Sequence, residues 1–333
     1  MPRLSVLIPA RDAARTVRAA VVSILRQTER DLGVVCVDDG SQDGTARILD
    51  DLAARDRRVT VVRGAGEGIA RALNRGLARC DADLVARMDA DDLAHPRRLE
   101  VQREALSADP TLTALGSRVT LFPRRTVRAG MARYAEWLNG LVTPELVHRD
   151  LLVESPLVHP AAMVRREPLD AAGGWRDGPY PEDYDLWLRL AERGGRLGNV
   201  PRRLLAWRES AGRLTRTDPR YALERHVALK CAFLSRALAP RREVAVWGAG
   251  ETGRAFADAL AAEGIRVALF VEVDRKKIGR MVRGAKVVSY EEVGRARGLP
   301  LLVAVGAPGA RDLIRAELAR AGFRETEDFR CVA

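Results

Sequence analysis

The sequence predicts an α/β protein of two domains, the first built on a mostly parallel sheet with helices on both faces. The chain has 333 residues, which is more than one hydrophobic core usually contains. Short apolar runs alternate with helical patterns near the start of the chain, and this alternation is typical of parallel sheets. The alternation starts again near residue 243. We therefore expect domains at 1–238 and 243–333, joined by a linker at 239–242.

The expected elements follow from the spacing of apolar residues. In the first part of the chain we expect strands at 4–9, 32–39, 59–64 and 82–92, with helices between them. The middle part predicts strands at 111–122, 155–166 and 199–210, and helices at 181–195 and 221–238. After the linker we expect a strand from 243, a helix at 253–264, and strands at 266–274 and 301–308.

The charge balance is basic without a pattern that indicates nucleic-acid binding. The formal net charge is +11, and 52 of the 56 basic residues are arginine, spread along the chain among 45 acids. No block of five or six like charges occurs, and aromatic residues make up only 5%, too few for a base-stacking surface. We therefore expect no nucleic-acid partner. A basic surface still favours anionic substrates or an acidic membrane face.

Targeting signals and cysteine pairs are absent from the sequence. No uncharged apolar run approaches the roughly eighteen residues of a membrane span, and the start of the chain does not resemble a secretory leader. We expect a cytoplasmic protein, with peripheral attachment to the inner face of the membrane as an open alternative. Four scattered cysteines form no CxxC pair, which favours reduced, structural thiols.

Carboxylates gather where two predicted strands end. Asp38 and Asp39 follow one strand, and Asp89, Asp91 and Asp92 follow another. Ligands of open parallel sheets bind at this edge, and Mg²⁺ or Mn²⁺ takes one or two carboxylates together with water and phosphate oxygens. Such an ion suits a diphosphate leaving group. The alternative is that these residues only end the strand and cap a helix, which fits Asp92 at least as well.

Six segments together resemble the family 2 glycosyltransferases. They are SVLIPARDAARTV, VDDGSQDGT, GIARALNRGL, DADLVARMDADD, VHPAAMVRR and YPEDYDLWLRLAERG, in the family's order, over about residues 3–235. The resemblance implies the GT-A fold, a nucleotide-sugar donor, a divalent metal, and inversion at the anomeric carbon. The appended C-terminal region resembles the small Rossmann-like domains attached to sugar-modifying transferases.

The resemblance also implies roles for residues on the donor side. Pro9 and Asp12 match the first loop around the nucleotide base, Asp39 matches a base-contacting carboxylate, and Arg71 falls in a nucleotide-sugar-binding segment. In the DxD pair, Asp89 is expected nearer the ribose, and the metal is expected on Asp91 with Asp89. The family usually has Asn where this chain has Asp12, so the effect of Asp12 on donor preference stays open.

A second acidic pair, Glu182 and Asp183, begins a predicted amphipathic helix. Acids in a first helical turn are favoured by the helix dipole alone. However, EDYDLW resembles the ED motif, which implies that Asp183 is the general base. A hydroxyl acceptor must lose its proton as it attacks, and one carboxylate suffices for direct displacement. Glu182 is assigned a secondary, orienting role.

Three further residues are candidates on the acceptor or diphosphate side. His159 either contacts the diphosphate or is a structural histidine, and the second interpretation is favoured. Trp175, after two glycines, is a candidate for stacking on the acceptor sugar, although tryptophans are more often core residues. Arg208 lies next to a segment, 208–216, that could close over the diphosphate.

The C-terminal region carries a glycine motif. Gly248, Gly250 and Gly253 form GxGxxG between a predicted strand and helix, and Glu272 ends the next strand, where a ribose-binding acid is expected. The region therefore either binds a nucleotide or only packs and dimerises.

The sequence as a whole predicts a metal-assisted inverting glycosyltransferase with a surface-glycan or lipid-linked acceptor, the acceptor class being implied by the resemblance. Two alternatives remain: an NAD(P)-dependent oxidoreductase that uses the C-terminal glycines, and a nucleotide-sensing protein. The donor base, the sugar and the acceptor are left open.

Overall fold

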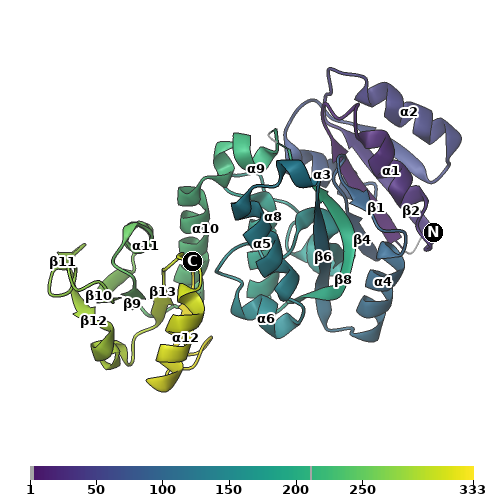
Figure 1. The fold of residues 1–333 in the computed structure, drawn as a ribbon. Coiled ribbons are helices and arrows are strands. Elements are labelled where there is room, and N and C mark those ends of the chain that lie inside the picture. Colours follow the sequence, from purple (N-terminus) through teal and green to yellow (C-terminus); the bar gives the residue numbers. More distant parts are fainter. Residues whose placement is uncertain (1–3, 211) are drawn as a thin grey trace. The chain divides into compact units, whose positions relative to one another are not determined.

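The structure, a computed structural model, describes residues 4–210 and 212–333. The chain divides into two compact units. The first unit comprises residues 1–148, 156–178 and 182–217, and the second comprises 149–155, 179–181 and 218–333. Figure 1 shows both units, the first around the strands β1 to β8 and the second around β9 to β13.

The first unit is built on a mixed sheet of eight strands, in the order β3-β2-β1-β4-β7-β6-β8-β5. The strands β3, β2, β1 and β4 are parallel, as are β6 and β8, whereas β7 runs antiparallel to both β4 and β6. The short β5 runs antiparallel to β8. Their bounds are β1 (Leu4–Ala10), β2 (Leu32–Asp38), β3 (Val59–Arg63), β4 (Leu84–Arg87), β5 (Leu93–Ala94), β6 (Leu112–Phe122), β7 (Met163–Arg165) and β8 (Arg196–Arg208).

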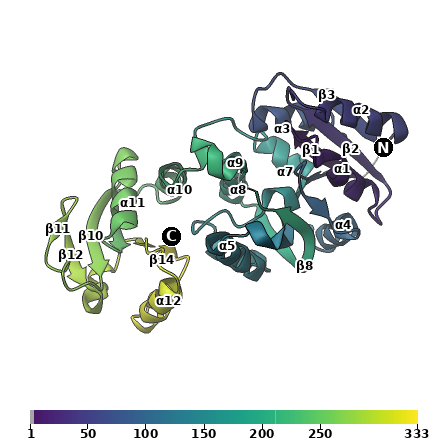
Figure 2. The ribbon, with the colours of Figure 1, turned by 45° about the horizontal axis from the view of Figure 1, so that its top comes forward.

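Helices cover the sheet of the first unit, and the central strand β1 is buried along almost its whole length. A Cβ on Gly76 would lie 2.3 Å from Leu7 Cδ1, so glycine lets α3 pack directly on the sheet. Figure 2 shows α1, α3 and α4 beside the strands. The helices are α1 (Val17–Leu25), α2 (Thr45–Arg55), α3 (Ile69–Leu77), α4 (Arg98–Ala108), α5 (Ala129–Gly140), α6 (Pro144–Arg149), α7 (Arg166–Ala171), α8 (Glu182–Glu192) and α9 (Leu214–Thr217), with 3-10 turns η1 (Arg124–Thr126) and η2 (His159–Ala161).

Two predicted strands are shorter than expected. The segment 155–166 forms a strand only at β7, because Pro156 and Pro160 lack the amide hydrogen that a central strand needs. The segment 82–92 forms a strand only at β4, after which the chain turns at Ala90 and Asp91. The carboxylates that follow β4 therefore lie on a turn and not on an extended segment.

The second unit contains a sheet of six strands in the order β11-β12-β10-β9-β13-β14. All neighbours are parallel except β11, which forms an antiparallel pair with β12. The strands are β9 (Glu243–Trp247), β10 (Arg266–Glu272), β11 (Met281–Val282), β12 (Ala285–Ser289), β13 (Leu301–Val303) and β14 (Phe329–Cys331). The helices are α10 (Leu223–Ala237), α11 (Glu251–Ala262) and α12 (Ala310–Arg320), with 3-10 turns η3 (Pro219–Tyr221) and η4 (Tyr290–Ala296).

The division between the units differs from the boundary expected at residue 238. Helix α10 belongs to the second unit, since it packs along α11 and buries Val227, Cys231 and Leu234 there. The short segments 149–155 and 179–181 also belong to the second unit. Helical periodicity predicts α10 itself but not that its apolar face packs against α11.

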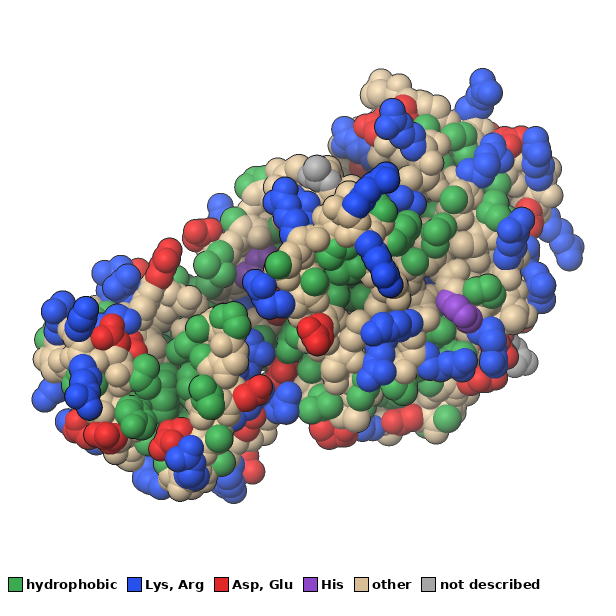
Figure 3. All heavy atoms as spheres, viewed as in Figure 1, with side chains coloured by type: hydrophobic (Ala, Val, Ile, Leu, Met, Phe, Trp, Pro, Cys, Tyr) green, Lys and Arg blue, Asp and Glu red, His purple; other side chains and the backbone are tan. Residues whose placement is uncertain are grey.

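The surface and the thiols agree with the composition. Figure 3 shows basic and acidic side chains interspersed over the visible face. The four cysteines are buried and unpaired. No helix within the described residues is long and apolar enough to cross a membrane.

Candidate active site at the end of strand β4

Three aspartates converge where β4 ends. The carboxylates of Asp89, Asp91 and Asp92 offer oxygens that all lie within 4.8 Å of one another. The turn at Ala90 and Asp91 brings them together, where the sequence predicts an extended segment with Asp89 and Asp91 on one side. Asp92, for which the sequence left a capping role and a ligand role open, is therefore part of the cluster.

Burial of like charges perturbs this cluster strongly. Burial, and then the neighbouring charge of Asp89, raises the pKa of Asp91 to about 6. Burial, followed by the charges of Asp89 and Asp91, raises the pKa of Asp92 well above its usual range. Asp92 Oδ2 is buried without a hydrogen-bond partner among the described residues. Three converging hard oxygen donors, one of them unsatisfied, fit a Mg²⁺ or Mn²⁺ ion.

Two buried arginines, which the sequence analysis did not single out, lie beneath the aspartates. Arg87, 2% exposed, forms an ion pair with Asp89. Burial opposes its charge, but Asp89 and then Glu182 and Asp92 raise the pKa of Arg87. Arg98 is fully buried, and its Nη2 donates to the backbone oxygen of Arg87 at 2.7 Å. Positions inside a strand of a covered sheet are normally apolar, so an arginine there is unusual. This signal in the sequence could have identified Arg87 as a candidate site residue.

Arg208 is attached to the same acidic turn. Its Nε donates to the backbone oxygen of Asp91 at 2.5 Å, and its backbone nitrogen donates to Asp92 Oδ1 at 2.6 Å. Its guanidinium lies 4.4 Å from the centre of the Phe122 ring. The end of β8 is thereby fixed against the aspartates, and a contact of Arg208 with the diphosphate stays a prediction.

The predicted donor-side residues lie at the carboxyl ends of β1 and β2 and in the following loops. Pro9 is half-buried near the end of β1. Asp12 has a φ of 49°, a left-handed conformation that Asn and Asp adopt more readily than other residues. Its Oδ1 accepts from the backbone nitrogen of Gln42 at 2.7 Å. Asn can adopt the same left-handed conformation and accept the same hydrogen bond. Asp12 can therefore occupy the position where the family usually has Asn.

Asp39 and Arg71 have partners of their own in the structure. The carboxylate of Asp39, 4% exposed, accepts from the backbone nitrogens of Gly66, Glu67 and Gly68 at 3.0, 3.0 and 2.9 Å. Asp39 therefore anchors the loop before α3. This role is separate from the contact with the nucleotide base that the resemblance implies. Arg71 is exposed and pairs with Asp177 at 3.0 Å.

Glu182 and Asp183 begin α8. Glu182 is buried and its Oε1 lies 3.7 Å from His159 Nδ1, whereas Asp183 is partly buried. The charge of Glu182 contributes to the raised pKa of Arg87, although the ion-pair partner of Arg87 is Asp89.

His159 and Trp175 are part of the core. Trp175 Nε1 donates to His159 Nε2 at 2.9 Å, and the His159 ring meets Trp187 edge-on at 6.0 Å. Trp175 is 2% exposed, and its backbone nitrogen and oxygen both bond the side chain of Asn74 on α3. The structure therefore supports the structural interpretation of His159. It does not support stacking of an acceptor sugar on Trp175, since neither face of the ring is open.

The glycine motif of the second unit has the expected backbone geometry. A Cβ on Gly253 would lie 1.8 Å from the backbone oxygen of Gly248, so α11 starts in close contact with the turn. A Cβ on Gly250 would meet only Lys277 Nζ, at 3.9 Å. Packing therefore requires glycine at position 253, whereas the space around Gly250 is open.

Glu272, however, is not arranged as a ribose ligand. Its Oε1 accepts from the backbone nitrogens of Val273 and Asp274, and its Oε2 accepts from Ala249 and from Lys277 Nζ, at 2.9 to 3.2 Å. These four donors use the acceptor sites of the carboxylate. The predicted contact of Glu272 with a ribose hydroxyl is therefore not supported.

A hollow of about 580 Å³ lies elsewhere on the first unit. Its lining includes Ser5, Leu32 and Thr60, at the amino ends of β1, β2 and β3. It contains none of the predicted site residues, which lie at the opposite ends of the strands.

The sequence of residues 5–173, about half of the chain, matches the family described as Glycosyl transferase family 2. The chain belongs to this family. The match includes β1 to β4 and the aspartate cluster and ends before Glu182 and Asp183. The protein is thus a glycosyltransferase, as the six motifs predict.

Curated relatives are also similar to this chain. EpsE of Bacillus subtilis, named as a glycosyltransferase, is 29% identical over 67% of this chain and 79% of its own length. A chondroitin synthase of Escherichia coli is 26% identical over 58% of this chain, which corresponds to 27% of that protein. This chain therefore spans about a quarter of the larger synthase.

Solved structures share the fold. The S. aureus protein TarS (residues 1–349) has a TM-score of 0.54 at 14% identity, covering 70% of this chain and 65% of that chain. A mannosyltransferase of Pyrobaculum calidifontis, in complex with GDP-Man and Mn²⁺, has a TM-score of 0.53 at 20% identity, covering 97% and 81%. Both are GT-A glycosyltransferases, so the first unit has the predicted GT-A fold.

Proposed function

We propose that the protein transfers a sugar from a nucleotide-diphosphate sugar to a hydroxyl acceptor, with a divalent metal and with inversion at the anomeric carbon. The observation that carries the proposal is the convergence of Asp89, Asp91 and Asp92 after β4, where the buried Oδ2 of Asp92 has no hydrogen-bond partner among the described residues. A diphosphate-binding metal group and an acceptor-side acid are the two components that such a reaction needs.

In this proposal Asp91 holds the metal, with Asp89 and Asp92 beside it. A divalent ion bound by these aspartates would neutralise the charge that develops on the departing diphosphate. Arg208 keeps the acidic turn in place through its bond to the Asp91 backbone. Arg87 balances the carboxylate charge beneath the turn, which limits the repulsion that three close aspartates would otherwise cause.

Asp183 is the proposed general base. It is only partly buried at the first turn of α8, so an acceptor hydroxyl can reach it, whereas Glu182 is buried beside His159. Asp183 takes the hydroxyl proton as the oxygen attacks from the face opposite the leaving group. Glu182, which is buried with its Oε1 3.7 Å from His159 Nδ1, positions the first turn and thus the base.

The donor and acceptor classes are proposed from the relatives. TarS has been solved with UDP-GlcNAc and the mannosyltransferase with GDP-Man, so a UDP-sugar or a GDP-sugar is the proposed donor. Relatives named for chondroitin, hyaluronan, O-antigen and amylovoran synthesis support a surface glycan or its lipid-linked precursor as the acceptor.

For the second unit we propose a Rossmann-like domain that serves packing. The strand order around β9 and the close contact of Gly253 with Gly248 support the fold. The occupied carboxylate of Glu272 gives no support to a bound dinucleotide or to an oxidoreductase reaction.

The test of the proposed reaction is Asp183→Asn. We expect release of nucleoside diphosphate from the preferred sugar nucleotide to fall at least about 100-fold, because proton transfer to a positioned base contributes a factor of this size. Calorimetric binding of the same sugar nucleotide should be unchanged. Glu167→Gln, which removes an exposed carboxylate from the first turn of α7, is the control for loss of a carboxylate. Wild-type turnover by Asp183→Asn would remove the base from the mechanism, and turnover unaffected by EDTA would remove the metal.

A further inference from the structure

A basic segment runs beside the candidate active site. Residues 110–135 contain five arginines and no acidic residue. One of these, Arg118, donates from Nε to the backbone oxygen of Asn139 at 2.7 Å. The other four are exposed, and none of their side chains forms a hydrogen bond or ion pair with another described residue: Arg124, Arg125, Arg128 and Arg133.

Apolar side chains lie among these arginines. Val127 and Met131 are only partly buried, the exposed residues around them include Ala129 and Ala132, and Leu214 on α9 is 47% exposed. Figure 3 shows apolar side chains exposed between basic ones on the face that carries α5 and α9. We call the four arginines together with Val127, Met131 and Leu214 the basic surface.

The basic surface is joined to the aspartate cluster by short contacts. The backbone nitrogen of Glu209 donates to the Phe122 backbone oxygen at 2.7 Å, and Thr126 Oγ1 donates to the Glu209 backbone oxygen at 2.8 Å. Arg208, whose guanidinium covers Phe122, bonds the backbone of Asp91. The 3-10 turn η1 and the start of α5 are thus held close to the metal-binding turn.

The aromatic residues behind the basic surface form a rigid support. Tyr134 and Trp137 on α5 stack with ring centres 5.8 Å apart, and Trp207 lies 6.3 Å from Tyr134. Arg213, which precedes Leu214, covers Trp207 at 4.3 Å. The arginines therefore project from a packed layer and not from a loose loop.

We propose that the basic surface binds the headgroup layer of an anionic lipid membrane, which brings the active site to a membrane-borne acceptor. Unpaired arginines are attracted to anionic headgroups, and apolar side chains between them favour a lipid interface over a soluble acidic polymer. This inference rests on the proposed function for its purpose. Membrane binding itself is independent of Asp183 and of the metal.

The test is sedimentation with vesicles of phosphatidylcholine containing 30 mol% phosphatidylglycerol, without donor or metal. We expect the full chain to bind these vesicles at low salt and not to bind pure phosphatidylcholine. The variant R124Q/R125Q/R128Q/R133Q should bind on the order of 100-fold more weakly, since each basic residue at a membrane surface contributes several-fold. The control R47Q/R57Q/R79Q/R193Q removes the same charge from other exposed arginines and should bind within about threefold of wild type.

Two outcomes would overturn the proposal. Equal weakening by both quadruple variants would show that net charge alone governs binding. Binding of soluble hyaluronate that depends on the four arginines, without vesicle binding, would assign the surface to an acidic glycan. Calorimetric binding of a sugar nucleotide by both variants verifies that they are folded. Because vesicle binding is measured without turnover, failure of the proposed reaction and failure of this inference are distinguishable.

Discussion

His159 is a neutral histidine with a defined tautomer. An indole nitrogen only donates, so Trp175 requires His159 Nε2 as an acceptor, and the imidazole proton then lies on Nδ1, facing Glu182 at 3.7 Å. Burial, and then the charge of Arg87, lowers the pKa of His159 well below its usual range. Protonation of His159 Nε2 would remove the hydrogen-bond acceptor of Trp175. This loss disfavours the protonated form, in agreement with the lowered pKa.

The depressed pKa of His159 predicts acid sensitivity. Below the ordinary histidine pKa of about 6.5, the unfolded chain binds a proton that the folded protein does not, so stability falls as pH decreases. The loss from this residue is at most about 1.4 kcal/mol per pH unit and stops below the folded-state pKa. His159→Gln keeps an acceptor for Trp175 but does not titrate.

Denaturant unfolding of wild type and His159→Gln at pH 7.5, 6.0 and 5.0 measures this effect. At pH 7.5 we expect wild type to have a larger free energy of unfolding than His159→Gln. The difference in free energy of unfolding between the two proteins should become smaller as pH falls. A difference that stays constant over this range would show that His159 protonates equally in both states.

At the scale of elements, the turn between β9 and α11 separates two glycines with different constraints. A Cβ on Gly253 would lie 1.8 Å from a backbone oxygen, which cannot move without shifting the strand. Gly250 has an ordinary φ of −81° and open space around it. The same motif therefore contains one position that packing requires to be glycine and one that it does not.

We expect Gly253→Ala to destabilise the second unit by about 3 kcal/mol, the upper range for overpacking, because backbone must be displaced. Gly250→Ala should cost about 1 kcal/mol or less, mainly from the poorer helix cap. Urea unfolding followed by the fluorescence of Trp247 on β9 compares the two variants. Similar losses for both would contradict the packing role of Gly253.

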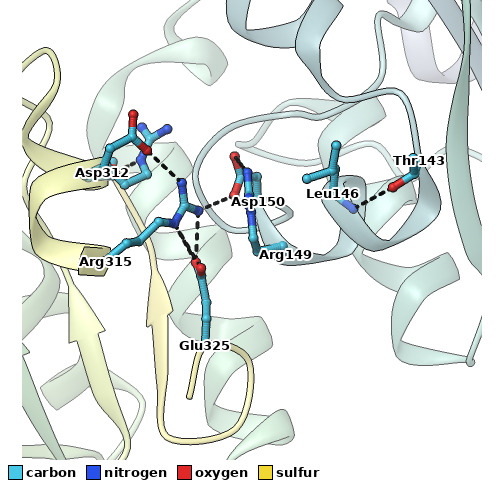
Figure 4. Close-up of polar contacts among 9 residues, drawn as sticks. Thr143, Leu146, Arg149, Asp150, Asp312, Arg315 and Glu325 are labelled. Atoms are coloured by element: carbon cyan, nitrogen blue, oxygen red, sulfur yellow. Dashed lines mark hydrogen bonds and ion pairs between the residues drawn. The ribbon is translucent and has the colours of Figure 1, made fainter. Parts of the chain in front are cut away.

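At the scale of the whole molecule, the second unit includes a short segment from within the transferase region. Lys230 on α10, 4% exposed, donates from Nζ to the backbone oxygens of Val153 and Val332 at 2.8 and 3.0 Å. Asp150, 1% exposed, forms ion pairs with Arg149 and Arg315. Figure 4 shows Arg315 between Asp150 and Glu325, with its Nη2 2.9 Å from Glu325 Oε1.

These contacts predict that the fragment 1–238, cut at the boundary that the sequence suggests, is unstable. It would leave Asp150 without Arg315, Lys230 without Val332, and the buried face of α10 exposed. Several kcal/mol are expected to be lost, a large fraction of the stability of an ordinary domain. We expect the fragment to aggregate or to melt at least about 10 °C below the full chain.

Thermal unfolding of the fragment and the full chain checks this prediction. Arg283→Gln in the full chain, which breaks an exposed pair with Asp258, is the control and should change the melting temperature little. A fragment that melts within about 3 °C of the full chain would show that residues 1–238 fold independently.

Much of the fold and part of the site could be predicted from local patterns. The strands β1 to β3, the helices α1, α8 and α10, and the acids after β4 lie where apolar spacing and motif position predict them. These features depend on neighbours in sequence, since one buried run or one periodic helix contains its own signal. The family also follows from six short motifs, each preserved in order along the chain.

Only the tertiary structure decided what each polar side chain contacts. Asp39 anchors a loop, Glu272 is saturated by four donors, and the buried Arg87 forms an ion pair with Asp89. The same holds for α10, whose apolar face is evident in sequence but whose partner α11 is not. Long-range pairing depends on which surfaces meet in the folded chain, and residue type and spacing specify only that a partner is required.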